Sequence, residues 1–194
     1  SVDKLTVTVT GDPTADHLNS TNPFALLTSM MLDQQYPMEH AFRGPAKVLE
    51  RLGAMDPEAI AAADPQEFAE LCATTPAVHR FPGSMAERMQ ELAALICGQY
   101  DGHTERLWTE ASDAQDLMSR LLELPGFGKQ KARIFMSLLA KQLDVRPEGW
   151  EAVAGDYALE GYRSVADVVD PASLQKVRDH KKEQKAAAKA AKAT

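Results

Sequence analysis

The amino-acid sequence predicts an all-α fold, because signals that start helices recur along the chain and strand patterns are nearly absent. Asparagine or aspartate precedes proline at Asn22-Pro23, Asp56-Pro57 and Asp64-Pro65, which combines an N-cap with a proline in the first helical turn. Apolar residues then recur every three to four positions, as in a helix with one buried face. Alternation of polar and apolar residues is confined to the N-terminus. Helices should therefore build almost the whole fold.

The N-terminal segment, residues 1–21, is the exception. Leu5–Thr10 alternates between apolar and polar residues and predicts one extended strand, which Gly11-Asp12-Pro13 closes. A single strand in a helical chain has no sheet to join, so we expect an appendage on the surface.

The helical domain is expected over residues 22–175, and its helices follow one another through short turns. A proline or a capping residue opens most of them, and amphipathic spacing supports the others. The predicted helices start at or near Pro23, Pro45, Pro57, Pro65, Ser84, Leu117 and Lys129, and shorter pieces start at Ser164 and Ser173.

Composition limits the class of protein. Hydrophobic residues make up 44% and charged residues 25% of the 194 residues, which is ordinary for a globular domain and excludes a disordered or fibrous chain. The longest uninterrupted apolar run, Leu92–Cys97, is far shorter than the roughly 20 residues that span a membrane. The N-terminus has no signal-peptide pattern. We therefore expect a cytoplasmic protein with no membrane partner.

Metal ligands are scarce. Cys72 and Cys97 are the only cysteines, and the five histidines form no pair at helical ligand spacing. An iron–sulfur cluster or a thiolate zinc site needs more thiols at closer spacing. We expect no metal site built from side chains and no cofactor.

Charge is unevenly distributed. The Ala/Lys-rich tail, residues 176–194, has seven Lys or Arg and two acids, so the overall charge of −7 leaves −12 for the first 175 residues. A lysine-rich tail on an acidic body can attract phosphates without reading sequence. A solubilising helix end is the alternative.

One segment carries a chemically specific pattern, Leu124-Pro-Gly-Phe-Gly-Lys-Gln-Lys-Ala132, inside a predicted hairpin of residues 117–142. Two glycines two positions apart permit a tight turn, and free amides at the next helix start favour an anion. Such a turn can hold a DNA phosphate, whereas an ordinary αα-hairpin is the alternative. The expected DNA contacts are Gly126, Phe127, Gly128, Lys129 and Lys131.

The chain resembles the helix-hairpin-helix family of base-excision DNA glycosylases in three blocks. Besides the hairpin, Asn22–Gln35 is similar to the family's early helix, which ends in glutamine near the lesion pocket. Phe81–Arg88 is similar to the turn before its long helix. The resemblance covers about residues 22 to 150 and looks closest to a small actinobacterial-type subgroup without an iron–sulfur cluster. It implies two helical lobes with a cleft between them, and double-stranded DNA as the partner.

The resemblance also implies a reaction. Relatives extrude a damaged base from the duplex and hydrolyse its N-glycosidic bond. The position that carries a nucleophilic lysine in lyase-active relatives is Gln130 here. Lys129 and Lys131 flank it, but one residue turns a helical side chain by about 100°, so neither should reach the sugar. The resemblance therefore implies a monofunctional glycosylase without lysine-dependent lyase activity.

Two carboxylates are candidates for catalysis. Glu148 stands where the family carries an aspartate that stabilises the cationic sugar and orients water; a solvated loop residue is its alternative. Asp33 precedes the Gln34-Gln35 pair and could accept a hydrogen bond from an exocyclic amine of the flipped base. An ordinary helix-end acid is its alternative.

Further side chains are candidates for contact with DNA. Gln34, Gln35 and Gln130 suit the lesion pocket, although helix capping would also explain the glutamine pair. His79 and Arg80 suit insertion into the base stack or contact with phosphate, and a plain turn is the alternative.

Three functions stay open at this point: a monofunctional glycosylase, a non-catalytic DNA-binding module that senses lesions, and a helical adaptor for another protein. The acidic body favours the last two, and the three similar blocks favour the first two. We expect a monomer with no obligate protein partner. The resemblance implies at most a monovalent cation on the hairpin carbonyls.

Overall fold

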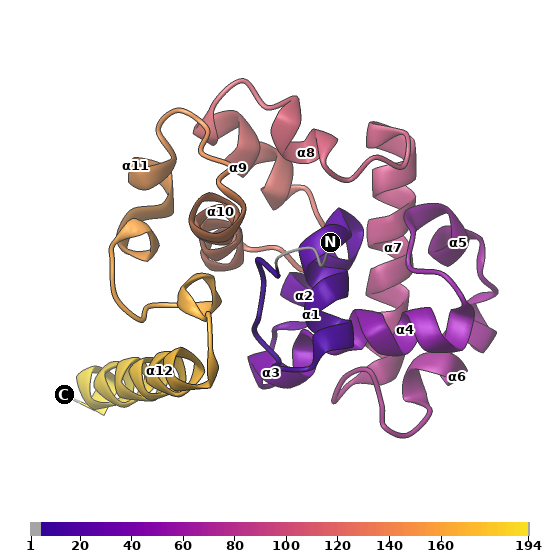
Figure 1. The fold of residues 1–194 in the computed structure, drawn as a ribbon, viewed down its shortest axis with the longest axis horizontal. Coiled ribbons are helices and arrows are strands. Elements are labelled where there is room, and N and C mark those ends of the chain that lie inside the picture. Colours follow the sequence, from indigo (N-terminus) through magenta and orange to yellow (C-terminus); the bar gives the residue numbers. More distant parts are fainter. Residues whose placement is uncertain (1–4, 194) are drawn as a thin grey trace.

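The computed structural model describes residues 5–193, which form only helices and connecting segments (Figure 1). The predicted all-α class is thereby confirmed. The helices are α1 Pro13–Thr21, α2 Pro23–Leu32, α3 Met38–Ala41, α4 Gly44–Leu52, α5 Pro57–Ala62, α6 Pro65–Ala73, α7 Pro82–Tyr100, α8 Arg106–Thr109, α9 Ala114–Leu122, α10 Lys129–Leu143, α11 Trp150–Ala154 and α12 Pro171–Ala193, with short 3₁₀ segments η1 Gly155–Ala158 and η2 Val165–Asp167.

Capping side chains start three helices where the sequence predicts them. A side-chain oxygen of each cap accepts a backbone N–H from the first turn, which otherwise has no partner inside the helix. Each such cap stabilises its helix by roughly 1 kcal/mol. The bonds run from Ala25 to Asn22 at 3.1 Å, from Ala59 to Asp56 at 2.8 Å and from Glu67 to Asp64 at 3.0 Å.

The helices pack in two sets that share one core. In the first set α7 packs against α5 and α6, and α2 packs against α1 and α4. In the second set α9, α11 and both 3₁₀ segments pack around α10. Figure 1 shows the first set on the right and the second on the left and top. Buried side chains from both sets, such as Leu27, Met89 and Phe135, belong to one continuous cluster.

The N-terminal segment differs from its prediction. Residues 5–12 are not helical but form no strand, and the helix α1 occupies the rest of the stretch expected to be extended. Val7 and Val9 are 0% and 2% exposed, so the segment is part of the core and not a surface appendage. The Ser20 hydroxyl accepts the Val7 N–H at 2.9 Å. The Ser20 side chain thus accepts the backbone N–H that a neighbouring strand would otherwise have bound.

Two helix starts also differ. Helix α7 begins at Pro82 and not after Ser84, whose hydroxyl instead donates to the Phe81 carbonyl. Helix α12 begins at Pro171 and continues to Ala193, so the basic residues 176–193 are part of one helix with the residues before them. Alanine and lysine are both strong helix formers, which explains the continuity. Among residues 5–193, no helix combines the length and the apolar character that crossing a bilayer requires.

Candidate functional site

The hairpin between α9 and α10 is a tight turn that requires glycine at one position. The N–H of Phe127 donates to the Leu124 carbonyl at 3.2 Å. Gly126 has a φ of 78°, and a Cβ there would lie 2.9 Å from Arg88 Cδ and 3.3 Å from Met31 Cγ. The turn therefore packs closely on α7 and α2, and any side chain at Gly126 would combine strain with a clash.

The start of α10 presents unsatisfied amides to solvent. Gly128 is its N-cap and provides no side-chain hydrogen bond, and both Gly128 and Lys129 are exposed. Phe127, by contrast, is only 6% exposed and packs edge-on against Phe135 at 6.2 Å between ring centroids. Of the predicted DNA contacts, Gly128 and Lys129 face outward, while Phe127 holds the turn from inside.

Lys131 points into the molecule. Its Nζ donates to the Met31 carbonyl at 2.9 Å, which ties α10 to the end of α2. Burial lowers the pKa of Lys131 from 10.5 to about 8, and the charges of Arg88 and Lys181 act in the same direction, while Asp33 opposes them. The lysine thus belongs to an internal cluster and not to the outer face of the hairpin.

Asp33 is an acidic member of this cluster. It is the C-cap residue of α2, and its side chain is 10% exposed. Burial raises the pKa of Asp33 from 3.8, and the nearby Lys181 and Lys131 partly counter that rise. Lys181 Nζ on α12 lies 4.0 Å from Asp33 Oδ2. The carboxyl therefore lies where α2, α10 and α12 meet, between two cations.

Gln34, which follows Asp33, is held by α7 and by the loop before it. His79 is 1% exposed; its Nδ1 accepts the Phe81 N–H at 3.0 Å, which leaves Nε2 to donate to the Gln34 carbonyl at 3.1 Å. Burial lowers the pKa of His79, which favours this neutral form. The Gln34 side chain accepts from Arg88 Nη1 at 2.9 Å. His79 thus positions the loop, and Gln35, with a φ of 53°, is left exposed.

Two other predicted site residues lie on the surface. Gln130 donates to the Tyr157 hydroxyl at 3.0 Å. Glu148 is exposed, and its backbone carbonyl accepts the Ala114 N–H at 2.9 Å. Within residues 5–193 the Glu148 side chain forms no hydrogen bond or ion pair. Of the two candidate carboxylates, only Asp33 forms an ion pair among residues 5–193.

Sequence reasoning missed three cations around the site. Arg88 stands on α7, and Arg178 and Lys181 stand on α12, where their spacing of three puts them on one helix face. Arg178 Nη1 lies 3.2 Å from an oxygen of Glu39, beside the Lys181–Asp33 contact. The spacing could have identified a common face for Arg178 and Lys181, but nothing in the sequence indicated which acids that face meets.

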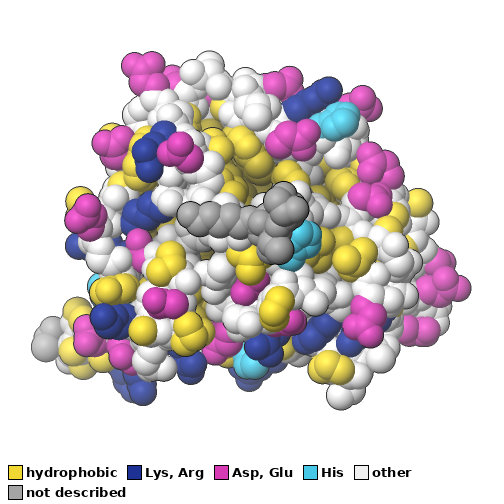
Figure 2. Space-filling view, in the orientation of Figure 1, with side chains coloured by type: hydrophobic (Ala, Val, Ile, Leu, Met, Phe, Trp, Pro, Cys, Tyr) yellow, Lys and Arg dark blue, Asp and Glu magenta, His cyan; other side chains and the backbone are white. Residues whose placement is uncertain are grey.

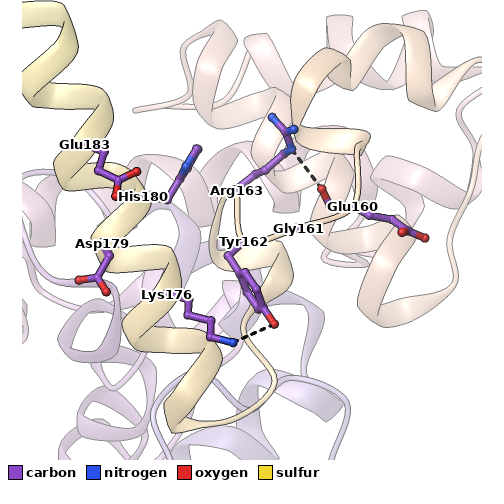
Figure 3. A pocket seen from close by; sticks show the side chains of 8 residues that line it. All are labelled: Glu160, Gly161, Tyr162, Arg163, Lys176, Asp179, His180 and Glu183. Atoms are coloured by element: carbon purple, nitrogen blue, oxygen red, sulfur yellow. Dashed lines mark hydrogen bonds between the residues drawn. The ribbon is translucent and has the colours of Figure 1, made fainter.

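Two surface cavities adjoin these elements. One, of about 280 Å³, lies between α12 and the loop before η2 and carries both signs of charge (Figure 3). The other, of about 790 Å³, lies beside α4, and we call it the α4 groove. The α4 groove is lined by Gln35, Tyr36, Pro37, His40, Arg43, Lys47, Pro76, Ala77, His79 and Arg80.

Comparison with known proteins identifies the family. Residues 28–193 match the model of the HhH-GPD superfamily base excision DNA repair proteins. No curated protein and no solved structure matches the chain. The matched range contains the hairpin, Asp33 and the cationic face of α12. The chain therefore belongs to the HhH-GPD superfamily of base excision DNA repair proteins.

Proposed function

We propose that this chain is a monofunctional DNA glycosylase, which takes a damaged or mismatched base out of the duplex and hydrolyses its N-glycosidic bond with Asp33 as the catalytic carboxylate. The observation that carries the proposal is the position of Asp33. It is a nearly buried acid, flanked by Lys131 and Lys181, beside a hairpin whose amides are open to a phosphate.

The environment of Asp33 suits two roles in such a reaction, which are to stabilise the positive charge on the sugar and to activate water. Cleavage of an N-glycosidic bond leaves positive charge on the sugar, and an ionised carboxylate stabilises it most where water is excluded. A raised pKa also makes the carboxylate a stronger base toward the attacking water. The pKa of Asp33 is raised by burial, while Lys181 and Lys131 favour its ionised form.

The hairpin supplies the sequence-independent contact with DNA in this proposal. The exposed amides after Gly128 stand at the positive end of the α10 dipole, and Lys129 stands beside them. The Leu124 carbonyl keeps a second lone pair after accepting the Phe127 N–H. This carbonyl could therefore coordinate a monovalent cation, and the resemblance predicts such a cation on the backbone oxygens of the hairpin.

Lyase activity is not part of the proposal. Gln130, at the position of the nucleophilic lysine in lyase-active relatives, has no amine, and the amine of Lys131 donates to the Met31 carbonyl. The product should therefore be an intact strand with an abasic site. A second proposal, a non-catalytic lesion-binding module, is favoured by the exposure of Glu148 at the position of the family's aspartate.

The test is base release from duplexes that carry uracil, hypoxanthine, 3-methyladenine, 8-oxoguanine or a mismatch, with alkali added to cut abasic sites. Wild type should give product on at least one lesion, and only after alkali. Asp33→Asn should lose the product, whereas Glu148→Gln and the exposed control Asp144→Asn should keep it.

Other outcomes assign the function differently. Loss of product with Glu148→Gln alone would transfer the catalytic role to Glu148. Product without alkali would refute the monofunctional reaction. No product from wild type on any lesion, with duplex binding retained, would support the non-catalytic module.

A further inference from the structure

The α4 groove gathers positive charge with no acid to balance it. Arg43, Lys47 and Arg80 line it, and none of them forms an ion pair within residues 5–193. Arg43 Nη2 donates to the Thr10 carbonyl at 3.3 Å, and Lys47 Nζ donates to the Ala77 carbonyl at 3.0 Å. Neutral carbonyls satisfy these donors without cancelling the charge, so the groove attracts anions.

Two further observations concern the cations of the groove. The Nε of Arg43 is buried and finds no hydrogen-bond partner among residues 5–193, which leaves a costly unsatisfied donor. Burial lowers the pKa of Lys47, and the charges of Arg51 and Arg43 lower it further. An anion in the groove would relieve the repulsion between Arg43 and Lys47.

A row of rings runs along the same surface. Ring centroids lie 5.7 Å apart from His40 to Tyr36, 4.7 Å from Tyr36 to His79 and 6.0 Å from His79 to Phe81. The guanidinium of Arg80 lies 5.4 Å from the Phe81 ring centre. Phe81 is 44% exposed and His40 is also exposed, so both ends of the row are open to a planar ligand.

The surroundings keep the groove cationic. Glu39 is the acid next to His40 in the chain, and it pairs with Arg178 on α12. The other cavity differs, because Glu160, Asp179 and Glu183 line it together with basic side chains (Figure 3). Figure 2 shows Lys and Arg side chains, with some Asp and Glu among them, along the lower left of the molecule, where α12 and α3 lie in Figure 1.

We propose that the α4 groove and the ring row bind unpaired nucleotides, with phosphates on Arg43, Lys47 and Arg80 and bases on the open rings. Cations that follow a backbone, next to aromatic faces on which bases stack, are the means by which proteins hold single strands. The volume of about 790 Å³ lies within the usual range for small-ligand sites.

The source of the nucleotide follows from the neighbouring site. His79 lines the groove and connects it to the residue after Asp33, because its ring contacts Tyr36 and its Nε2 donates to the Gln34 carbonyl. The strand next to the flipped nucleotide is therefore the expected occupant, an assignment that rests on the proposed glycosylase function. A free mononucleotide has the same chemistry and is the other source.

Binding of a short labelled oligothymidylate to the full chain, followed by fluorescence anisotropy over a salt series, tests the proposal. Lys47→Met should reduce the slope of log affinity against log salt by about 0.7, the value for one phosphate contact on a single strand. Arg106→Met removes the same charge from an exposed site on α8 and should leave the slope unchanged. Phe81→Ala should weaken binding by roughly tenfold through lost stacking.

Competition with thymidine 5′-monophosphate separates the two sources. If the monophosphate displaces the oligonucleotide at similar concentration and needs Lys47, the groove binds free nucleotides. If only the oligonucleotide binds, the groove binds a strand. Equal affinities and slopes for wild type, Lys47→Met, Phe81→Ala and Arg106→Met would overturn the proposal. Circular dichroism on each variant checks that it is folded.

This result is independent of the base-release assay. Lys47-dependent binding of the oligonucleotide without base release from any lesion would refute the glycosylase and keep the groove. Base release, together with single-strand binding that does not depend on Lys47 or Phe81, would support the glycosylase and refute the groove.

Discussion

Lys131 gives the protein a pH-dependent stability that can be measured directly. Burial lowers its pKa in the folded protein from 10.5 to about 8. The unfolded chain therefore holds more protons than the folded chain between about pH 8 and 10.5. By linkage, the free energy of unfolding must rise with pH across that window, because deprotonation removes a buried charge that the folded state tolerates poorly.

The magnitude follows from the two pKa values. At pH 7 the charged Lys131 should cost about 3 kcal/mol, and by pH 9.5 about 2 kcal/mol of that is recovered. Lys131→Met keeps the apolar stem and removes the charge. It also removes the hydrogen bond to the Met31 carbonyl, worth about 1 kcal/mol. The variant should therefore be more stable than wild type at pH 7 and lose that advantage by pH 9.5.

Urea unfolding followed by circular dichroism at pH 7, 8 and 9.5 measures this difference. Lys129→Met is the matched control, because it makes the same substitution in the same helix at a lysine that is exposed. Its unfolding free energy should follow that of wild type at every pH. Parallel curves for wild type and both variants would show that Lys131 titrates as a solvated lysine, and the internal cluster would be refuted.

Three further predictions concern the site. Asp33→Asn should slow base release by at least ~100-fold, the usual contribution of a general base, with duplex affinity retained in an anisotropy assay; unchanged release would exclude Asp33. Lys181→Met removes a cation that lowers the pKa of Asp33, so the acid limb of the pH–rate profile should move to higher pH, and a shift to lower pH would contradict this. Gly126→Ala, which places a Cβ 2.9 Å from Arg88 at a φ of 78°, should lower stability by about 1 to 3 kcal/mol and weaken binding to every duplex sequence. Gly128→Ala, with open space around its Cβ, should leave the unfolding transition unchanged.

Local signals explain what the sequence predicted of the fold. Helix α10 starts at Lys129 and ends at Leu143, as its apolar spacing indicates, and the Asn22 and Asp64 caps lie where proline follows them. The N-terminal segment could not be predicted in this way. The alternating pattern at Val7 and Val9 does not indicate whether the segment packs against a strand or a helix. The Ser20 hydroxyl accepts the Val7 N–H only in the folded molecule.

The candidate site also has one part that local sequence signals predict and another part that depends on the packing of distant helices. The hairpin and the segment from Asp33 to Gln35 are contiguous in the chain, so a motif identifies them. The orientation of Lys131 depends on how α10 lies against the end of α2. The rotation of about 100° per residue gives only the direction of Lys131 relative to other side chains of α10. Arg88 and Lys181 come from helices far away in the sequence, and pairing at that range leaves no local pattern.

The position of Asp33 explains how α12 can influence the candidate site. At the C-terminal end of α2 the helix dipole is negative, and burial acts in the same direction, so a lone carboxyl there would favour its protonated form. An electrostatic role in catalysis needs the ionised form. Lys131 shifts the balance toward ionisation, Asp33 in turn opposes the burial that lowers the pKa of Lys131, and Lys181 adds a second cation from α12. The segment expected to be a basic tail thus contributes to the charge state of the candidate catalytic group, which is consistent with a family match that extends to residue 193.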